Sequence, residues 1–188
     1  MSFSATRLSC YALLSALEED LRRHINQNLG HLPPGVVFTD DEVEKTRARR
    51  RGDGGAVDPF SAEALLPYLD FADSNQILRR HAGRLPENLV QALGFVTKRL
   101  EKLVAARNRV AHTRPMDMDD LPNLLDLCDE LVPGGNSALW EYLAETLNRI
   151  KEEPSFVLGM KIDLPKGPGH RAMAQPSGAR LRRDGLLR

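Results

Sequence analysis

The sequence has few of the features that mark secreted or membrane-spanning proteins. Its 188 residues include only two cysteines, Cys10 and Cys128, which lie far apart and form no CxxC motif. This usage is typical of a reducing, cytoplasmic setting, and we expect two buried free thiols. The apolar stretch near the N-terminus is interrupted by Glu18, Glu19 and Asp20. We therefore predict neither a signal peptide nor a membrane span, and no contact with a membrane.

Motifs for nucleotide, acyl or metal chemistry are missing as well. The sequence contains no P-loop, no GxSxG motif and no Gly-rich phosphate loop. His24 and His31 are seven residues apart, but no thiol or third ligand lies near them. A zinc pair is therefore not expected. Any activity is predicted to need no metal and no cofactor.

A net charge is also lacking, because 26 Lys and Arg balance 26 Asp and Glu. No global basic field therefore indicates nucleic-acid binding. The charge is uneven, since residues 161–188 contain seven Lys or Arg and two Asp, a net +5 that leaves −5 on residues 1–160. Pro and Gly recur between Pro165 and Gly178. We predict a helical domain over residues 1–160 and a basic linker or flexible tail over residues 161–188.

Strand patterns are nearly absent, whereas apolar residues recur with helical spacing along most of the chain. Residues 5–29 predict a first helix with one buried stripe. Further helices are predicted over 40–51 (polar, weakly packed), from Ser61 to a break or kink at Pro67, from Asp73 or Ser74 to His81, over 86–112, over 117–131 and from Asn136 or Ser137 to Lys151. Residues 155–162 are predicted to be a short extended segment. The expected architecture is an all-α bundle centred on the first helix and the long helix 86–112.

The end of helix 86–112 carries the candidate site. Its apolar seam advances in alternating steps of four and three residues, through Leu89, Leu93, Val96, Leu100, Leu103, Arg107 and Val110. Arg107 is thus predicted to occupy a core position. Asn108 and His112 are four residues apart and share an adjoining face. Pro115 disfavours continuation of the helix, so His112 is expected in the last turn.

Glu18 is a second candidate, on the predicted first helix. It lies four residues after Leu14 and three before Leu21, which points it toward the interior or its edge, whereas Glu19 points away. A carboxylate there needs a partner, and Arg22, one turn later, is one choice. Alternatively, Glu18 is a boundary residue that bends outward to water.

The motif Arg107-Asn108-x-x-x-His112 at a helix end, preceded by a first helix with an inward acid, resembles the HEPN superfamily of "higher eukaryotes and prokaryotes nucleotide-binding" domains. The stretch LPYLDFAD (66–73) also looks like the middle of HEPN domains in defence and NTPase-linked proteins. The resemblance covers about residues 8–150. It implies an up-and-down helical bundle, a homodimer with a composite cleft, and RNase activity in a defence or stress effector. Arg114 stands where a toxin subgroup has tyrosine, which disfavours that version.

The resemblance and the residue types imply a cleavage in which the RNA 2′-OH attacks the adjacent phosphate. His112 is expected to act as acid and base, because histidine titrates near neutral pH. Arg107 is expected to stabilise the phosphate charge. Asn108 would orient His112 or the phosphate, and Glu18 would hold Arg107 or tune His112. The arginines expected to contact RNA are Arg22, Arg109 and Arg114.

Three alternatives remain open. In the first, the role of the site is structural: Arg107 and Glu18 form a buried strut, and His112 caps the helix C-terminus, where a cation is favoured. The chain is a non-catalytic HEPN-like dimerisation or sensor module, whose basic tail leads to a protein partner or a further domain. Finally, the chain regulates a neighbouring NTPase or nuclease.

Overall fold

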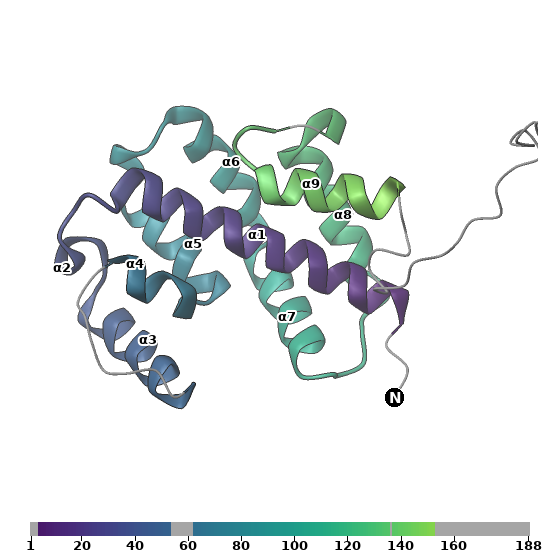
Figure 1. The fold of residues 1–188 in the computed structure, drawn as a ribbon. Helices are drawn as coiled ribbons and strands as arrows, with labels where there is room; N and C mark the ends of the chain where they lie inside the picture. Colours follow the sequence, from purple (N-terminus) through teal and green to yellow (C-terminus); the bar gives the residue numbers. More distant parts are fainter. Residues whose placement is uncertain (1–3, 54–61, 136, 153–188) are drawn as a thin grey trace, which may run out of the picture.

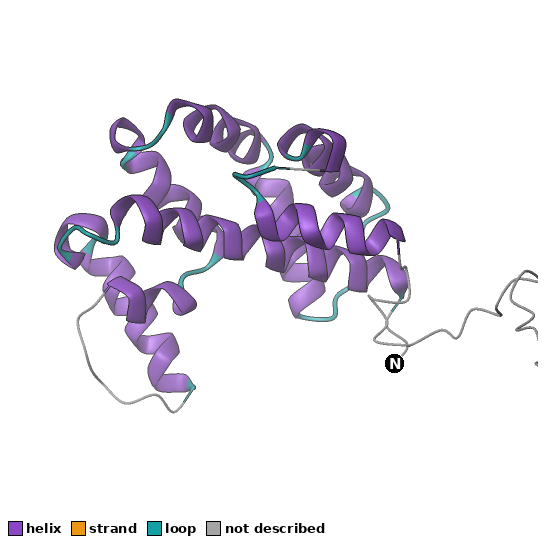
Figure 2. Ribbon diagram, turned by 45° about the horizontal axis from the view of Figure 1, so that its top comes forward, coloured by secondary structure: helices purple, strands orange, loops and turns teal. Residues whose placement is uncertain are grey.

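The structure is a computed structural model that describes residues 4–53, 62–135 and 137–152. Within these ranges all regular structure is helical, which confirms the all-α prediction (Figure 2). The predicted extended segment 155–162 and the basic tail 161–188 lie outside the described residues. No helix in the described ranges is long and apolar enough to cross a bilayer. The α-helices are α1 (Ala5–Leu29), α2 (Pro34–Val37), α3 (Asp40–Gly52), α4 (Ala62–Leu65), α5 (Phe71–Arg80), α6 (Glu87–Lys98), α7 (Leu100–Ala111), α8 (Asp120–Leu131) and α9 (Glu141–Glu152).

Helix α1 is the axis of the fold, and it runs through the middle of the molecule in contact with α5, α7, α8 and α9 (Figure 1). Ser4 begins it by accepting a hydrogen bond from the Arg7 backbone N–H at 3.3 Å. Every residue of its predicted stripe is buried: Leu14, Leu17, Leu21, Ile25 and Leu29. The helical spacing therefore correctly identified the face that four other helices cover.

The prediction of one continuous helix over 86–112 is wrong. The chain leaves helical geometry at Arg99 (φ −111°, ψ 4°), which separates α6 from α7. The Arg99 guanidinium is held by Glu130 of α8 at 2.7 and 2.9 Å. Both halves pack against α5 and α8, and α7 packs against α1 as well. Val96 and Leu103, on either side of the break, are both buried as predicted.

Three predicted helix starts are also wrong. Helix α5 begins one turn earlier than predicted because Asp70 caps it, accepting from the Asp73 N–H at 2.8 Å. Helix α8 begins at Asp120 rather than Asp117. Helix α9 begins at Glu141 rather than directly after Ser137. At α5 and α9 an acidic side chain accepts from backbone N–H groups of the first turn, whereas the start of α8 has no side-chain cap.

Helix α3 packs more tightly than its polar composition predicts. Thr39 and Glu42 form a reciprocal capping box, and Glu42, Val43 and Thr46 are buried. Arg80 of α5 pairs with Glu42 at 2.7 Å, which ties α3 to the body of the bundle. The buried acid therefore has a cation as its partner.

The two thiols are buried in the core, as predicted. Burial, with the nearby negative charge of Asp120, raises the pKa of Cys10 to about 11. Burial, with the negative charge of Asp129, raises the pKa of Cys128 to about 12. Both groups stay protonated at neutral pH and act as small apolar side chains rather than nucleophiles.

Candidate functional site

The C-terminus of α7 presents His112 at a sharp turn. His112 is the residue that ends the helix, and its backbone N–H donates to the Asn108 carbonyl at 3.1 Å. Thr113 then adopts a left-handed conformation (φ 52°), and the Arg114 N–H donates back to the Arg109 carbonyl at 2.9 Å. The His112 side chain is exposed at this corner. The turn therefore places an imidazole in solvent at the helix end, as predicted.

Arg107 lies at the edge of the core, not in it, so its predicted core position is wrong. Its side chain is 39% exposed, whereas Leu103 and Val110, a turn before and a turn after, are buried. The cause is Glu18 of α1, whose Oε1 lies 3.4 Å from Arg107 Nε. The guanidinium stays beside this carboxylate at the rim because burying it further would remove its hydration.

Glu18 lies between two arginines, as its position in the sequence suggested. Its side chain is 13% exposed, and Arg22 Nη2 lies 3.4 Å from its second oxygen. Glu19 points away and is 58% exposed, also as predicted. Glu18 therefore links α1 to α7 through Arg107 and receives part of its charge compensation from Arg22.

Arg107 lines two hollows. The smaller, of about 110 Å³, is bounded by Tyr11, Leu14, Ser15, Glu18, Arg107, Val110 and Ala111. The larger, of about 400 Å³, is bounded by Arg22, Arg49, Asp53, Pro67, Tyr68, Leu69, Asp70 and Arg107. Arg49, one of three arginines in the last turn of α3, forms ion pairs with Asp70 at 2.9 Å and Asp73 at 3.1 Å. The Arg107 guanidinium is therefore accessible from both sides of its ion pair with Glu18.

The three arginines expected to contact RNA have different surroundings. Arg22 is 17% exposed and donates to Glu18, to Glu19 at 3.0 Å and to the Leu69 carbonyl at 2.9 Å. Arg109 forms a two-point ion pair with Asp120, with Nε–Oδ2 at 2.8 Å. Arg114 is exposed. Arg22 thus ties α1 to the segment before α5, and Arg109 ties α7 to α8, whereas Arg114 is the most exposed of the three.

The structure brings Arg107, Glu18 and Arg22 into contact, but not the whole predicted set. Within the described part of the chain, no hydrogen bond or ion pair joins the side chains of Asn108 or His112 to Arg107 or Glu18. Five residues along a regular helix turn its face by about 140°, so Arg107 and His112 of one chain point in different directions. Arg107 faces α1, whereas His112 faces solvent at the helix end.

The most deeply buried acid on α1 is Asp20, which the sequence reasoning missed. It is fully buried and accepts from Arg23 at 2.9 Å and from the Leu143 N–H at 2.9 Å and the Tyr142 N–H at 3.3 Å. Burial raises the pKa of Asp20, and these donors partly offset that rise. Asp20 therefore caps α9 from another helix. The signal was present, because Cys10, Leu13, Leu17, Asp20 and His24 continue one seam with alternating steps of three and four residues.

His24 belongs to the same buried cluster and does not resemble a metal ligand. Its ring nitrogen Nε2 lies 2.7 Å from the Leu139 carbonyl, and its ring meets the edge of Trp140. Burial lowers the pKa of His24, so its neutral form is favoured. His31, the second histidine of the considered zinc pair, is exposed. Among the residues that the structure describes, no His, Cys, Asp or Glu group is arranged to hold a metal ion.

The Arg109–Asp120 pair predicts an acid-sensitive contribution to stability. The Arg109 side chain and the Asp117 backbone N–H, acting against burial, hold the pKa of Asp120 below its ordinary value of 3.8. The stabilisation is therefore complete above 3.8 and is lost as the pH falls through the lower, native pKa. We expect Asp120→Asn to lower the free energy of unfolding by about 1–3 kcal/mol at neutral pH and by less under acid conditions. Urea unfolding at both pH values measures the difference, and a constant deficit would contradict the ion-pair explanation.

Comparisons with known proteins add no identification: no family model, no curated protein and no solved structure matches this chain.

Proposed function

We propose that this chain is a metal-independent endoribonuclease of the HEPN kind. The observation that carries the proposal is Arg107, a half-exposed guanidinium held at 3.4 Å by a largely buried carboxylate, with an exposed histidine at the end of the same helix. Glu18 orients Arg107 without covering it, so donors remain for a phosphate in either adjoining hollow. A guanidinium provides paired donors that match phosphate oxygens.

The proposed reaction needs a base, an acid and stabilisation of negative charge. His112 removes the proton from the 2′-OH of the RNA, and the 2′ oxygen attacks the adjacent phosphorus. The bond from phosphorus to the 5′ oxygen breaks, and a protonated imidazole supplies the proton to that leaving oxygen. Arg107 donates to the non-bridging oxygens as their charge rises. The products are a 2′,3′-cyclic phosphate and a 5′-hydroxyl, with no net consumption of protons.

The directions of Arg107 and His112 support a site shared between two copies of the chain. One chain presents these side chains about 140° apart around a regular helix, which does not bring both to one phosphate. Two α7 ends facing each other would supply Arg107 and His112 from both chains to a single cleft. Tyr11, which is 58% exposed and lines the smaller hollow beside Arg107, provides apolar surface for that contact. We therefore propose a homodimer.

The charged residues around the site are proposed to have different roles, according to whether a carboxylate already binds them. Arg22 and Arg109 are held by carboxylates, so their proposed role is to keep the surrounding helices in place. The exposed Arg114 is the proposed contact for the RNA backbone. Asn108, one turn before His112, is proposed to orient the phosphate or the imidazole. Residues 1–160 carry −5 and residues 161–188 carry +5, so the basic segment is proposed to attract RNA to an otherwise acidic chain.

The test is incubation of the full-length protein with single-stranded RNA in EDTA, followed by analysis of the product ends. We expect cleavage that EDTA does not inhibit and products with 2′,3′-cyclic phosphate and 5′-hydroxyl ends. Cleavage that requires added metal, or products with 5′-phosphate ends, would contradict the proposed chemistry. Gel filtration with light scattering measures the expected dimer.

A second candidate function is a non-catalytic dimerisation or sensor module of the same kind. The observation that favours it is that the Arg107–Glu18 pair and the helix-ending His112 also form a structural strut and a helix terminus. In this case RNA binds without cleavage, or a protein partner binds only when residues 161–188 are present. Removal of those residues, with RNA cleavage and partner binding measured in parallel, separates the two functions.

A further inference from the structure

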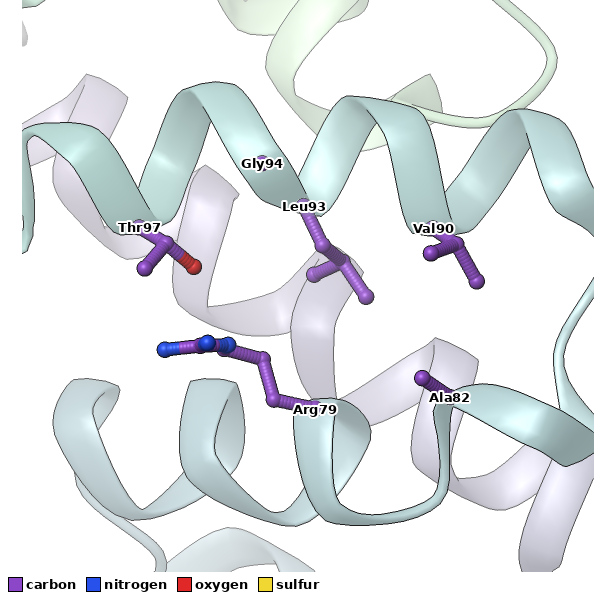
Figure 3. A pocket seen from close by; sticks show the side chains of 6 residues that line it. All are labelled: Arg79, Ala82, Val90, Leu93, Gly94 and Thr97. Carbon is purple, nitrogen blue, oxygen red and sulfur yellow. The ribbon is translucent and has the colours of Figure 1, made fainter.

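A groove between α5 and α6 lies apart from the Arg107 site. It encloses about 320 Å³ and is bounded by Arg79, Ala82, Val90, Leu93, Gly94 and Thr97, a mainly apolar surface with one charge (Figure 3). A volume of this size matches the lower range of small-molecule pockets. Arg79 lies nine residues after Asp70 along α5, about 14 Å at the helical rise, and Asp70 lines the larger Arg107 hollow. The groove is therefore a separate feature of the molecule.

The guanidinium of Arg79 is available to a ligand. Its neighbour Arg80 is occupied, because it donates to Glu42 at 2.7 and 3.1 Å and to the Val37 carbonyl at 3.0 Å. By contrast, none of the residues described by the structure forms a hydrogen bond or ion pair with the Arg79 side chain. Arg79 is exposed, and Figure 3 shows its guanidinium extended beneath Thr97.

Thr97 makes one end of the groove polar. Its hydroxyl is covered and, within the described residues, has no hydrogen-bond partner, and it points toward the Arg79 guanidinium (Figure 3). The Thr97 hydroxyl can both donate and accept, and in the described part of the chain no hydrogen bond joins it to the Arg79 guanidinium. An acceptor placed between them would bond to both. A second hollow, of about 510 Å³, shares Arg79 with the groove. It is also lined by Asn75, which is 1% exposed and whose Oδ1 has no hydrogen-bond partner among the described residues.

The rest of the groove is suited to an apolar body. Val90, Leu93 and Ala82 supply hydrocarbon, and Gly94 leaves space, since a Cβ there would meet no atom within 4 Å. Arg79 is the one charged residue that lines the groove, so it suits a ligand with a single negative charge. Its paired N–H donors match the two oxygens of a carboxylate. A phosphate dianion would leave charge uncompensated beside one arginine.

From these features we propose that the α5–α6 groove binds an apolar carboxylic acid, with its carboxylate between Arg79 and Thr97 and its hydrocarbon along Leu93, Val90 and Gly94. The ligand is a small organic acid rather than RNA. This site does not depend on the proposed RNase activity, because it shares no residue with the Arg107 hollows.

Titration of the full-length protein with decanoate, followed by backbone amide NMR, tests the site. We expect saturable shifts confined to α5 and α6, and binding weaker by about tenfold or more for decanol, which lacks the charge. Arg79→Gln is expected to weaken decanoate binding by about tenfold or more, since it removes the charge-assisted pair. Gly94→Leu fills the groove and is expected to abolish binding, while improving helix propensity so that the fold is retained.

Arg51→Gln is the matched control, because Arg51 is an exposed arginine of α3 that lines neither the α5–α6 groove nor the second hollow of about 510 Å³. Its decanoate affinity is expected to equal that of the unmodified protein. Circular dichroism checks that each variant is folded. The proposal is overturned if decanoate gives no saturable shifts, if Arg79→Gln binds it as tightly as Arg51→Gln does, or if folded Gly94→Leu still binds it.

Discussion

Replacing His112 with alanine is expected to slow RNA cleavage by about 10²- to 10⁴-fold, the usual range for loss of a general acid or base. The side chain is exposed at the end of α7, so its removal leaves the core intact and the stability unchanged. The rate is measured under single-turnover conditions in EDTA, with thermal unfolding recorded for each variant. His31→Ala is the matched control, because His31 is also an exposed histidine but lies just after the C-terminus of α1.

Cleavage that survives His112→Ala at the unmodified rate would rule out His112 as the acid or base. Arg107→Ala is expected to lose about 10²- to 10³-fold, because it removes the donors to the phosphate. Mixing the Arg107→Ala and His112→Ala chains tests the shared cleft. If Arg107 and His112 act from different protomers, the mixture regains activity that neither variant has alone, whereas a site within one chain regains none.

Replacing Asp20 with alanine is expected to lower the free energy of unfolding by about 3–5 kcal/mol, the typical cost of removing one partner from a buried ion pair. Asp20 is fully buried and accepts from Arg23 and from two backbone N–H groups at the start of α9. Without it, the 18% exposed Arg23 loses a carboxylate, and the Leu143 N–H loses its acceptor. Urea unfolding, followed by circular dichroism, measures the loss.

Two variants separate this effect from the removal of any acid on α1. Asp20→Asn keeps an acceptor of the same shape at the start of α9, so it is expected to lose less than Asp20→Ala. Glu19→Ala removes an adjacent acid that is 58% exposed, and it is expected to change the stability by about 1 kcal/mol or less. If Asp20→Ala and Glu19→Ala were equally stable, the buried capping of α9 by α1 would contribute nothing.

Several features could be predicted from the sequence because they depend on residues close together in the chain. The stripe of α1, the inward edge position of Glu18 and the helix end at His112 all follow from helical periodicity and local sequence. The all-α class follows from the same periodicity over the whole domain. The residue types Arg107, Asn108 and His112 also define the candidate chemistry, which remains a proposal.

Other features were decided only by the tertiary structure. The helix breaks at Arg99, whose guanidinium pairs with Glu130 of α8, and Arg107 lies at the rim because Glu18 of another helix holds it there. The start of α9 depends on Asp20, more than a hundred residues earlier. The availability of Arg79, as opposed to Arg80, depends on where Glu42 lies. Helical periodicity identifies the face that a residue occupies, but the partner of a charged group depends on which distant side chains folding brings beside it.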